Sequence, residues 1–487
     1  MMRGVGLLTR MKWLAACAVA CAAACAPVPQ KDAPVKLNTV APLAGMDLET
    51  RDGAQWPAAK WWEHYADPTL NQIVDLGLAT APSLSNARAR FDTARASVRE
   101  AGANVGARVD LDASYTRQRL SDNGLFPPAF LGLHWYDEAD LGLKASYTFD
   151  WWGKQHAAIE SAVDAARARE AEGLAAHLAL VSSIVDTYFG WQLDQSRLQV
   201  ARQRVVSTER QEAIAAARIR AELESPDSLN DVHALAGAAR EQLAVLEGSA
   251  RLRIVALAAL VGVPAAQLPV LTPRPLPAIA AELPDDVGID LLARRPDIVA
   301  SRWRVEAAEK TVTAARSDFY PDVSLRALAG VQSLKLGKLL EVGSGVPLVS
   351  AAVHLPLFDA GRLSARYGFS RAQLQSAIAD YDDAVNAAAR DVATQASNRQ
   401  QLLAQQRERN FALMSAQSSR KAAQARVHAG VTDLRPQLSA EQNELSQVDA
   451  VLQLQGAALS VDIALQRALG GGYGADARLA SNTQKKP

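Results

Sequence analysis

Cysteine is almost absent from this chain of 487 residues. The only three, Cys17, Cys21 and Cys25, lie within the first 25 positions. The rest of the chain therefore cannot use disulfides, thiolate metal sites or a cysteine nucleophile. Such a composition suits the periplasm, an oxidising compartment in which stray thiols would react.

Net charge is absent as well, because 52 basic side chains balance 52 acidic ones. Without a basic excess we predict no binding to nucleic acid. The seven histidines are scattered without the spacing of metal ligands, and no nucleophile elbow, phosphate loop or dinucleotide motif stands out. We therefore predict that the protein is not an enzyme, holds no cofactor or metal, and takes the energy for any transport from a partner.

The first residues have the features of a lipoprotein signal peptide. Three basic side chains precede residues 13–24, an apolar run too short to span a bilayer but of the right length for a signal-peptide core. Small residues precede each cysteine, and Cys25 follows the complete core. We predict lipidation of Cys25, with Cys17 as the alternative and an ordinary cleaved signal peptide as a third interpretation. Translation from Met11 in place of Met1 would make the signal compact.

The chain contains an internal duplication. A constant shift of 214 relates residues 82–111 to residues 296–325, and the shift becomes 208 at the pair Gly153 and Gly361. Ordered self-similarity of this kind predicts two halves with one plan: helix, strand pair, long helix, turn and helix.

Four stretches alternate between apolar and polar residues with the period of two that is typical of strands. They cover residues 109–117, 143–151, 323–327 and 349–357. A run of about 9 residues is long enough for a tilted strand to cross a bilayer. Beyond residue 25 no run of 18 apolar residues is free of charges, so we predict no transmembrane helix there. Half-buried strands in a soluble sheet are the alternative interpretation.

The polar faces of these strands carry charges that a water-filled interior would accept: Asp110, Asp112, Lys144, Asp150 and Arg326. We predict that these side chains face the lumen of a barrel. Because the smallest membrane barrels need about 8 strands, four strands close only when several subunits contribute, and three copies would supply about 12.

Long helices make up most of the remaining chain. Residues 154–223 contain no proline and are rich in helix formers, which predicts one helix about 100 Å long. A return helix runs to about residue 259, and residues 363–469 repeat this helical hairpin. Helices of such length that carry charges throughout are typical of coiled coils. The hairpins could tile the wall of a hollow cylinder, and a solid bundle is the alternative.

The motifs, taken in order, resemble the outer membrane factor family of the TolC and OprM type, and more narrowly its NodT-like lipoprotein branch. The resemblance covers about residues 56–475. It rests on Trp61-Trp62 with Asp67-Pro68-Thr69-Leu70, the segment from Tyr147 to Lys154, the segment from Arg294 to Ile298 with Phe319-Tyr320-Pro321, the segment from Leu355 to Arg362, and the segment from Ala468 to Tyr473.

The resemblance implies a mainly α-helical protomer with a small β part. Long antiparallel coiled-coil hairpins and four transmembrane strands would come from each copy, and a homotrimer would form a 12-stranded β-barrel and a helical periplasmic tunnel. The implied function is the outer-membrane exit duct of a tripartite efflux system, which passively conducts small toxic compounds or drugs. The implied partners are a periplasmic adaptor, an inner-membrane pump reached indirectly, and the outer-membrane lipids that hold the anchor.

The resemblance also places the constriction and the adaptor contacts at the hairpin tips, residues 224–229 and 428–435. We expect Asp433 to line the constriction, with Asp227 and Asp231 as further candidates, although an aspartate at such a turn can equally cap a helix. The expected adaptor contacts are Gly430, Val431 and Thr432, which match the family's tip pattern, and Ser225 and Pro226, which depart from it.

The predicted organisation is a signal peptide (1–24), a linker (25–60), a first repeat (61–270), a linker (271–287), a second repeat (288–472) and a flexible tail (473–487). Two alternative functions stay open: a type I protein-secretion duct and a structural envelope lipoprotein without a channel. The segment 121–128 resembles a loop of family members linked to resistance against aromatic acids and fusaric-acid-type compounds.

Overall fold

The computed structural model describes residues 28–31, 33, 35–37, 56–123, 128, 132, 134–277 and 291–473. Both candidate lipidation sites, Cys17 and Cys25, lie outside these residues. The chain divides into two compact units. The sheet unit takes in Asp92–Arg167, Arg302–Asp380 and the segment up to Lys36. The helical unit takes in Leu37–Phe91, Ala168–Ser301 and the segment from Tyr381 onward.

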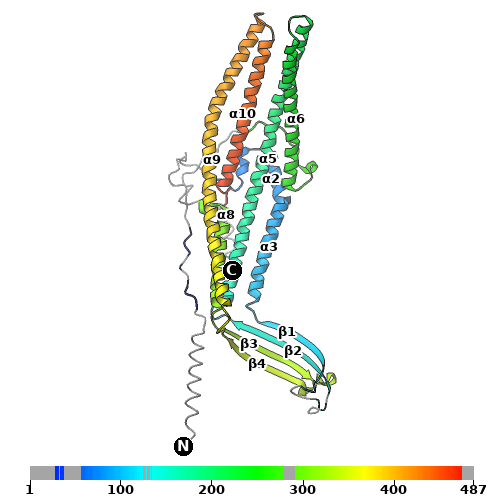
Figure 1. Ribbon diagram of the computed structural model, residues 1–487, viewed down its shortest axis with the longest axis vertical. Coiled ribbons are helices and arrows are strands. Elements are labelled where there is room, and N and C mark those ends of the chain that lie inside the picture. The colour runs from blue at the N-terminus through cyan, green and yellow to red at the C-terminus, as the bar shows by residue number, and fades with distance from the viewer. Residues whose placement is uncertain are drawn as a thin grey trace. The chain divides into compact units, whose positions relative to one another are not determined.

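The sheet unit is built around one antiparallel sheet (Figure 1). Its strands are β1 Arg108–Arg119, β2 Trp135–Phe149, β3 Asp322–Ser333 and β4 Gly345–His354, hydrogen-bonded in the order β1-β2-β3-β4. Two hairpins, β1–β2 and β3–β4, are joined by the pairing of β2 with β3. The strands β1 and β4 are therefore the two edges of the sheet.

Several strand boundaries differ from the predicted ones, most of all the start of β2, the end of β3 and both ends of β4. Strand β2 begins at Trp135, well before residue 143. The sequence does not reveal this start, because Asp137, Glu138 and Asp140 interrupt the alternation. Strand β4 ends at His354 and not at residue 357, since Pro356 has no N–H group to donate to a neighbouring strand. Residues 135–142, where no strand was predicted, are therefore paired with β1.

Helices account for most of the described chain. Those of four residues or more are η1 Trp61–Tyr65, α2 Pro68–Thr80, α3 Pro82–Ala103, α5 Lys154–Arg220, α6 Asp227–Val261, α7 Leu291–Arg294, α8 Pro296–Ser317, α9 Arg362–His428 and α10 Arg435–Ala468. The helices α3, α5, α8 and α9 run from one unit into the other. The long helices end within a few residues of their predicted ends, because Pro226 and Gly430 stand at the turns between them.

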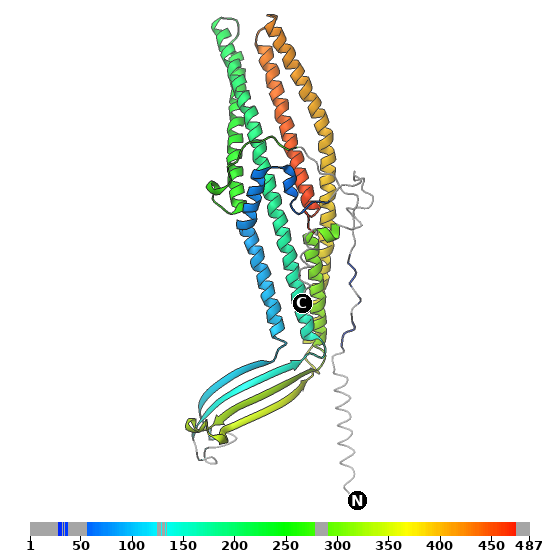
Figure 2. The ribbon, with the colours of Figure 1, turned by 180° about the vertical axis from the view of Figure 1, so that it is seen from behind.

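Four helices of the helical unit lie in a single row in the order α9-α10-α5-α6 (Figures 1 and 2). Polar contacts tie each pair of neighbours: Arg420 to Glu444 at 2.9 Å between α9 and α10, Arg197 to Asp449 at 2.8 Å between α5 and α10, and Arg240 to Glu212 at 3.2 Å between α6 and α5. Within the described chain no ion pair joins α6 to α9. A single row is a wall, whereas a solid bundle packs its helices around one core.

The core of the helical unit lies where η1 and α2 pack on α5, α6 and α10. It contains Trp61, Trp62, Leu70, Ile73, Ile184, Leu257, Leu459 and Ile463, all at most 3% exposed. Asp67 begins α2, because its carboxylate accepts hydrogen bonds from the backbone N–H groups of Thr69 at 2.9 Å and Leu70 at 3.3 Å. The motif at residues 61–70 thus anchors η1 and α2 to the core.

Among the described residues, α10 is long and apolar enough to cross a membrane by length and composition, a criterion that core helices of soluble proteins also meet. Its acidic side chains, however, have partners on other elements. Asp449 pairs with Arg197, and Asp462 accepts a hydrogen bond from the hydroxyl of Tyr65 at 2.7 Å. These contacts make α10 a packed helix of the helical unit.

Candidate functional site

Four of the five charged side chains predicted to face a lumen share one face of the sheet. Asp110 lies directly opposite Lys144, and Ser146 lies directly opposite Arg326. The Nζ atom of Lys144 is 3.4 Å from Oδ2 of Asp112. Opposite residues in an antiparallel pair, and alternate residues along a strand, point to the same side. The register therefore gathers these charges on one polar face.

Asp150, the fifth of these side chains, lies just beyond the strand whose polar face carries Lys144. Strand β2 ends at Phe149. The Asp150 carboxylate accepts hydrogen bonds from the backbone N–H groups of Gln155 at 3.1 Å and His156 at 2.8 Å, at the start of α5. Asp150 is therefore a helix cap. The alternation in the sequence runs past the point where the strand stops pairing.

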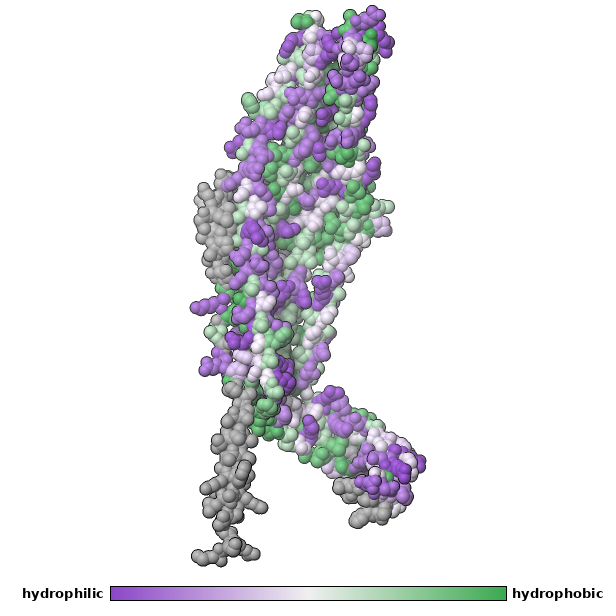
Figure 3. Space-filling model, in the orientation of Figure 1, coloured by the Kyte–Doolittle hydropathy of each residue, from purple (hydrophilic) through white to green (hydrophobic). Residues whose placement is uncertain are grey.

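The opposite face of the sheet is apolar and open to its surroundings. Val109, Leu111, Val349 and Val353 are 63, 67, 75 and 70% exposed. Figure 3 shows hydrophobic residues beside hydrophilic ones on the visible side of the sheet. Contiguous exposed apolar surface of this kind marks a surface that contacts lipid or another protein.

Aromatic rings stand at both ends of the apolar face. Trp135 begins β2, and Tyr147, Phe149 and Trp151 stand at its other end, with ring centroids 4.9 Å apart for the first pair and 5.7 Å for the second. Rings that bracket an apolar band are typical of strands that cross a bilayer, because they sit at the level of the lipid headgroups.

The turn from β2 into α5 is fixed by contacts from the second half of the chain. The ring of Trp152 stacks on Tyr320 with centroids 4.6 Å apart, and its Nε1–H donates to the carbonyl of Pro321 at 2.9 Å. The Nζ atom of Lys154 is 2.7 Å from a carboxylate oxygen of Asp318, whose side chain is 7% exposed. The Trp-Gly-Lys motif thus joins the sheet to the helices that leave it.

Opposite charges from the two hairpin tips meet in a group that we name the tip cluster: Arg218, Glu224, Asp433 and Arg435. Within the second tip, the Arg435 guanidinium is 2.9 Å from Asp433. Between the tips, Arg435 is 3.0 Å from Glu224, and Arg218 is 3.6 Å from Asp433. The hydrogen bond from Arg435 holds the pKa of the Asp433 carboxyl below its usual range.

The sequence analysis placed Asp433 at a tip but missed its partners. Arg218 and Glu224 lie on the other hairpin, about two hundred positions away in the chain. No pattern of local spacing links such residues. The available signal was that each tip carries both acidic and basic side chains near its turn.

The other predicted tip residues lie outside the tip cluster. Asp227 is the first residue of α6 and Asp231 follows one turn later; both are exposed. The Ser225 carbonyl accepts a hydrogen bond from the Ser228 hydroxyl at 2.8 Å, and Pro226 stands immediately before α6. Asp227 and Asp231 have no ion pair with the cluster in the part of the chain that the structure describes.

The second tip turns at Gly430, whose φ of 71° is in the left-handed region that glycine adopts without strain. The N–H of Val431 donates to the carbonyl of Arg426 at 3.0 Å, which closes the end of α9. Val431 is 74% exposed, and Thr432 is half-buried. This tip therefore presents a small, partly apolar surface.

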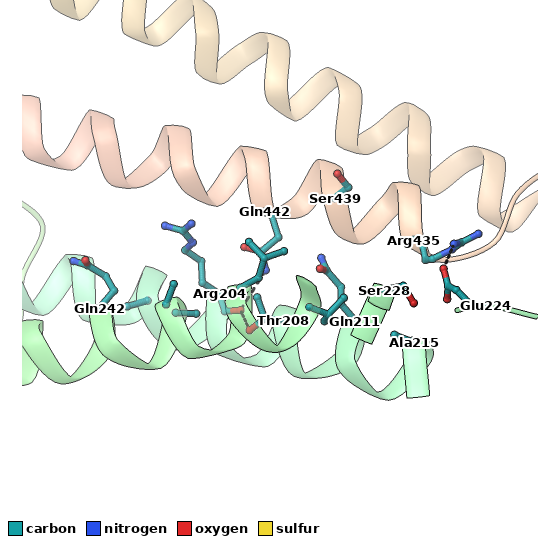
Figure 4. A pocket seen from close by; sticks show the side chains of 15 residues that line it. Arg204, Thr208, Gln211, Ala215, Glu224, Ser228, Gln242, Arg435, Ser439 and Gln442 are labelled. Carbon is teal, nitrogen blue, oxygen red and sulfur yellow. Dashed lines mark hydrogen bonds and ion pairs between the residues drawn. The ribbon is translucent and has the colours of Figure 1, made fainter. Parts of the chain in front are cut away.

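A cavity of about 530 Å³ opens between the α5–α6 hairpin and α10 (Figure 4). Glu224 and Arg435 of the tip cluster line one end of it, and Arg204, Thr208 and Gln442 line its middle. The lining mixes polar and small apolar side chains without any nucleophile and base in contact. Among the described residues no group of three or more His, Cys, Asp or Glu side chains could hold a metal ion.

Comparison with known proteins is consistent with this architecture. The profile of the family described as outer membrane efflux protein matches residues 73–263 and 289–471. The multidrug resistance outer membrane protein MdtQ of Escherichia coli O157:H7 is 31% identical over 456 residues, which cover 91% of this chain and 95% of MdtQ. MdtP of Escherichia coli O6:H1 is 29% identical over 425 residues, which cover 86% of this chain and 87% of MdtP.

Solved structures of outer-membrane proteins have the same fold as this chain. The outer membrane protein VceC of Vibrio cholerae has a TM-score of 0.75 and 32% identity, and the match covers 86% of this chain and all of VceC. The outer-membrane channel OprN has a TM-score of 0.80, and the match covers 92% of this chain and 99% of OprN. Because the two sequences are only 24% identical, this match shows a common fold and nothing more.

The fold and these matches define an outer-membrane channel protein of the TolC-like class, whose members are channels and not enzymes. The chain belongs to the outer membrane efflux protein family. It is located in the outer membrane and acts as an efflux exit duct, which confirms the resemblance seen in the sequence.

Proposed function

We propose that three copies of this chain close a 12-stranded barrel through the outer membrane and continue it as a helical tunnel in the periplasm. The observation that carries this proposal is the four-stranded sheet, which has an exposed apolar face and two exposed edges, β1 and β4. Long open edges are avoided in finished folds because they template pairing with another chain. Closure by further copies removes both edges, and lipid covers the apolar face.

The polar face of the sheet then lines the lumen. Asp110, Asp112, Lys144 and Arg326 face water in this arrangement, which avoids the cost of burying unpaired charge. The arrangement of α9, α10, α5 and α6 in a single row favours the wall of a tunnel and not a solid coiled-coil bundle.

The tips form the periplasmic end of the duct in this proposal. Asp433 lines the constriction, and Asp227 and Asp231 are further candidates. The exposed Val431 beside Gly430 supports contact of the second tip with a periplasmic adaptor, and Thr432, Ser225 and Pro226 complete that surface. The adaptor links the duct to an inner-membrane pump that supplies the energy.

The lipid anchor is proposed to be Cys25, with Cys17 as the alternative. Support comes from the segment just after it, which is docked on the sheet unit. The Nε–H of Arg316, near the end of α8, donates to the carbonyl of Pro29 at 2.8 Å. Four residues span at most about 14 Å, which ties the acyl chains close to the start of the sheet. Acylation that persists in Cys25→Ser, measured by mass spectrometry, would move the anchor to Cys17.

The cargo is proposed to be small toxic compounds, including drugs, because MdtQ and MdtP are named multidrug resistance proteins. A type I protein-secretion duct remains the second candidate function. The two-repeat organisation, residues 61–270 and 288–472, is likewise a proposal, and the two separate family matches support it.

Growth of a deletion strain and its complemented control tests the function. The panels are weak aromatic acids on one side and cationic dyes or antibiotics on the other. Broad sensitivity of the deletion strain indicates a multidrug duct, and sensitivity to the acids alone indicates an aromatic-acid duct. Normal growth on both panels, with a secreted protein missing from the medium, would favour the secretion duct instead.

A further inference from the structure

The cavity between the α5–α6 hairpin and α10 has the size of a ligand-binding site. Its volume of about 530 Å³ falls within the range of roughly 300–1,000 Å³ that is typical of sites for small molecules. All of its lining residues belong to α5, α6, α10 or the turn at Glu224, within the helical unit of one chain. The cavity therefore does not depend on the proposed assembly of several copies.

The cavity exists because small side chains line much of its wall. The small residues in the lining are Ala201, Ala215, Ala238, Ala239 and Ser439. On one side of the cavity the hairpin is filled by an apolar cluster that includes Leu198 and Leu246. On the other side the ion pair between Glu224 and Arg435, at 3.0 Å, joins the two tips. Between these two packed regions the helices leave an open space.

One basic side chain in this space has an unsatisfied donor. Among the described residues, the guanidinium Nε atom of Arg204 is shielded from solvent and has no hydrogen-bond partner. Figure 4 shows the Arg204 side chain in the space between the hairpin and α10. An N–H group left in this state costs free energy, which an acceptor supplied by a ligand recovers.

The charge of the lining favours an anion as that ligand. The charged side chains of the lining are Arg204, Arg435 and Glu224, two cations against one anion. The Glu224 carboxylate is already paired, because it lies 3.0 Å from Arg435 and 3.4 Å from Arg218. A ligand with a carboxylate would therefore bring the charge that Arg204 lacks within the lining.

The rest of the lining suits a molecule that has an apolar body behind its anionic group. Leu235 is 57% exposed and Val232 is half-buried, and both line the α6 side of the cavity. Gln211 and Gln242 add amide groups that can donate to a second oxygen of the ligand. Covering the two apolar side chains would stabilise the bound state.

We infer that this cavity is a binding site for a small organic carboxylate, with the carboxylate on Arg204 and the apolar body against Val232 and Leu235. A carboxylate can accept two parallel N–H bonds from one guanidinium, which fixes its orientation. This inference goes beyond the proposed duct, because a duct passes its cargo whereas this site retains a molecule between helices of its wall.

Calorimetric titration with cinnamate tests the site, and cinnamamide is a neutral ligand of nearly the same shape. The complete protein is used in lipid nanodiscs, and empty nanodiscs report partition of the ligands into lipid. We expect cinnamate to bind and cinnamamide to bind at least about tenfold more weakly, because hydrogen bonds to a charged partner are stronger than neutral ones.

Three variants locate the binding. Arg204→Gln removes the guanidinium group, and Ala238→Leu fills the cavity from an exposed position of α6, so each should weaken cinnamate binding at least about tenfold. Arg210→Gln removes the same charge from an exposed position of α5 that does not line the cavity, and should leave the affinity unchanged. Because Ala238 is exposed, its substitution tests the cavity without disturbing the packed core.

Loss of binding in Arg204→Gln and Ala238→Leu, together with native affinity in Arg210→Gln, would support the site. Binding that survives either of the first two substitutions would place cinnamate elsewhere and overturn the assignment. Equal affinity for the amide would overturn the choice of an anion, and no heat above that of empty nanodiscs would overturn the site as a whole. None of these results changes the test of the duct by the deletion strain.

Discussion

Glu222 and Gly430 occupy equivalent positions at the ends of the two long helices, α5 and α9. Both have positive φ angles, 60° and 71°. After each, the next N–H donates to a carbonyl five residues back, Leu223 to Arg218 at 2.9 Å and Val431 to Arg426 at 3.0 Å. The two tips therefore end their helices with one motif, which glycine adopts freely and glutamate adopts at a cost.

This equivalence predicts opposite effects of two substitutions. Gly430→Ala should destabilise the protein by about 1 kcal/mol, because alanine pays for the left-handed conformation. Glu222→Gly should leave the free energy of unfolding unchanged or raise it slightly, because glycine adopts the left-handed conformation without strain. Denaturant unfolding followed by circular dichroism measures both. Equal losses from the two substitutions would mean that the turns do not share this motif.

The boundaries of the helices could be predicted from the sequence, whereas those of the strands could be predicted only in part. The ends of α5 and α9 follow from local chemistry, since helix formers run unbroken to the turns. The start of β2 at Trp135 does not, because Asp137 and Glu138 break the pattern that reveals a strand. The end of β2 at Phe149, just before Asp150, does not follow from the sequence either, because the alternation does not show where pairing stops.

The tip cluster predicts a pH effect on conduction. The pKa of Asp433 is lower in the folded protein than in the unfolded chain, so its stabilising contribution is present at neutral pH and is lost as pH falls through that folded pKa. Arg435→Gln removes the main partner and raises this pKa toward its usual value. Tip opening, measured as single-channel conductance in lipid bilayers, should then set in at a higher pH than in the native protein.

Arg220→Gln is the matched control for the tip variant. Arg220 is exposed at the end of α5 and has no ion pair with the tip cluster in the described chain. Arg220→Gln removes one positive charge close to the tips, as Arg435→Gln does. Identical conductance–pH curves for Arg435→Gln and Arg220→Gln would show that net charge, and not the cluster, governs the tip.

A pair of glycines sets the spacing of the two central strands. Gly142 and Gly330 lie directly opposite each other on the polar face. A Cβ atom on Gly330 would lie 2.7 Å from the carbonyl oxygen of Leu141 and 2.8 Å from the Cα of Gly142, both backbone atoms that cannot move aside alone. Gly330→Ala should therefore destabilise the sheet by about 1–3 kcal/mol.

Gly337→Ala provides the comparison for this sheet variant, because an added Cβ there meets nothing within 4 Å. The fraction of oligomer surviving a temperature series, read on unheated gels, reports both variants. A native-like melting curve for Gly330→Ala would contradict the close approach of β2 and β3.

The core holds a buried acid whose partner is a tyrosine. The Asp462 side chain is fully buried and accepts a hydrogen bond from the Tyr65 hydroxyl, and burial raises the pKa of this carboxyl. Tyr65→Phe removes the donor and leaves the carboxyl less well satisfied, which should cost about 1–3 kcal/mol. Tyr136→Phe, at an exposed hydroxyl on β2, should change stability by less than about 0.5 kcal/mol. Chemical denaturation of both variants measures the two losses of stability. Equal stability of the two variants would show that the hydrogen bond from Tyr65 to Asp462 does not stabilise the core.

Electron microscopy of the purified protein tests most directly whether several copies form a hollow duct. Class averages viewed along the long axis should show a three-fold ring with a central hole. A filled rod, or a single chain without rotational symmetry, would contradict the duct and leave a structural envelope lipoprotein in its place.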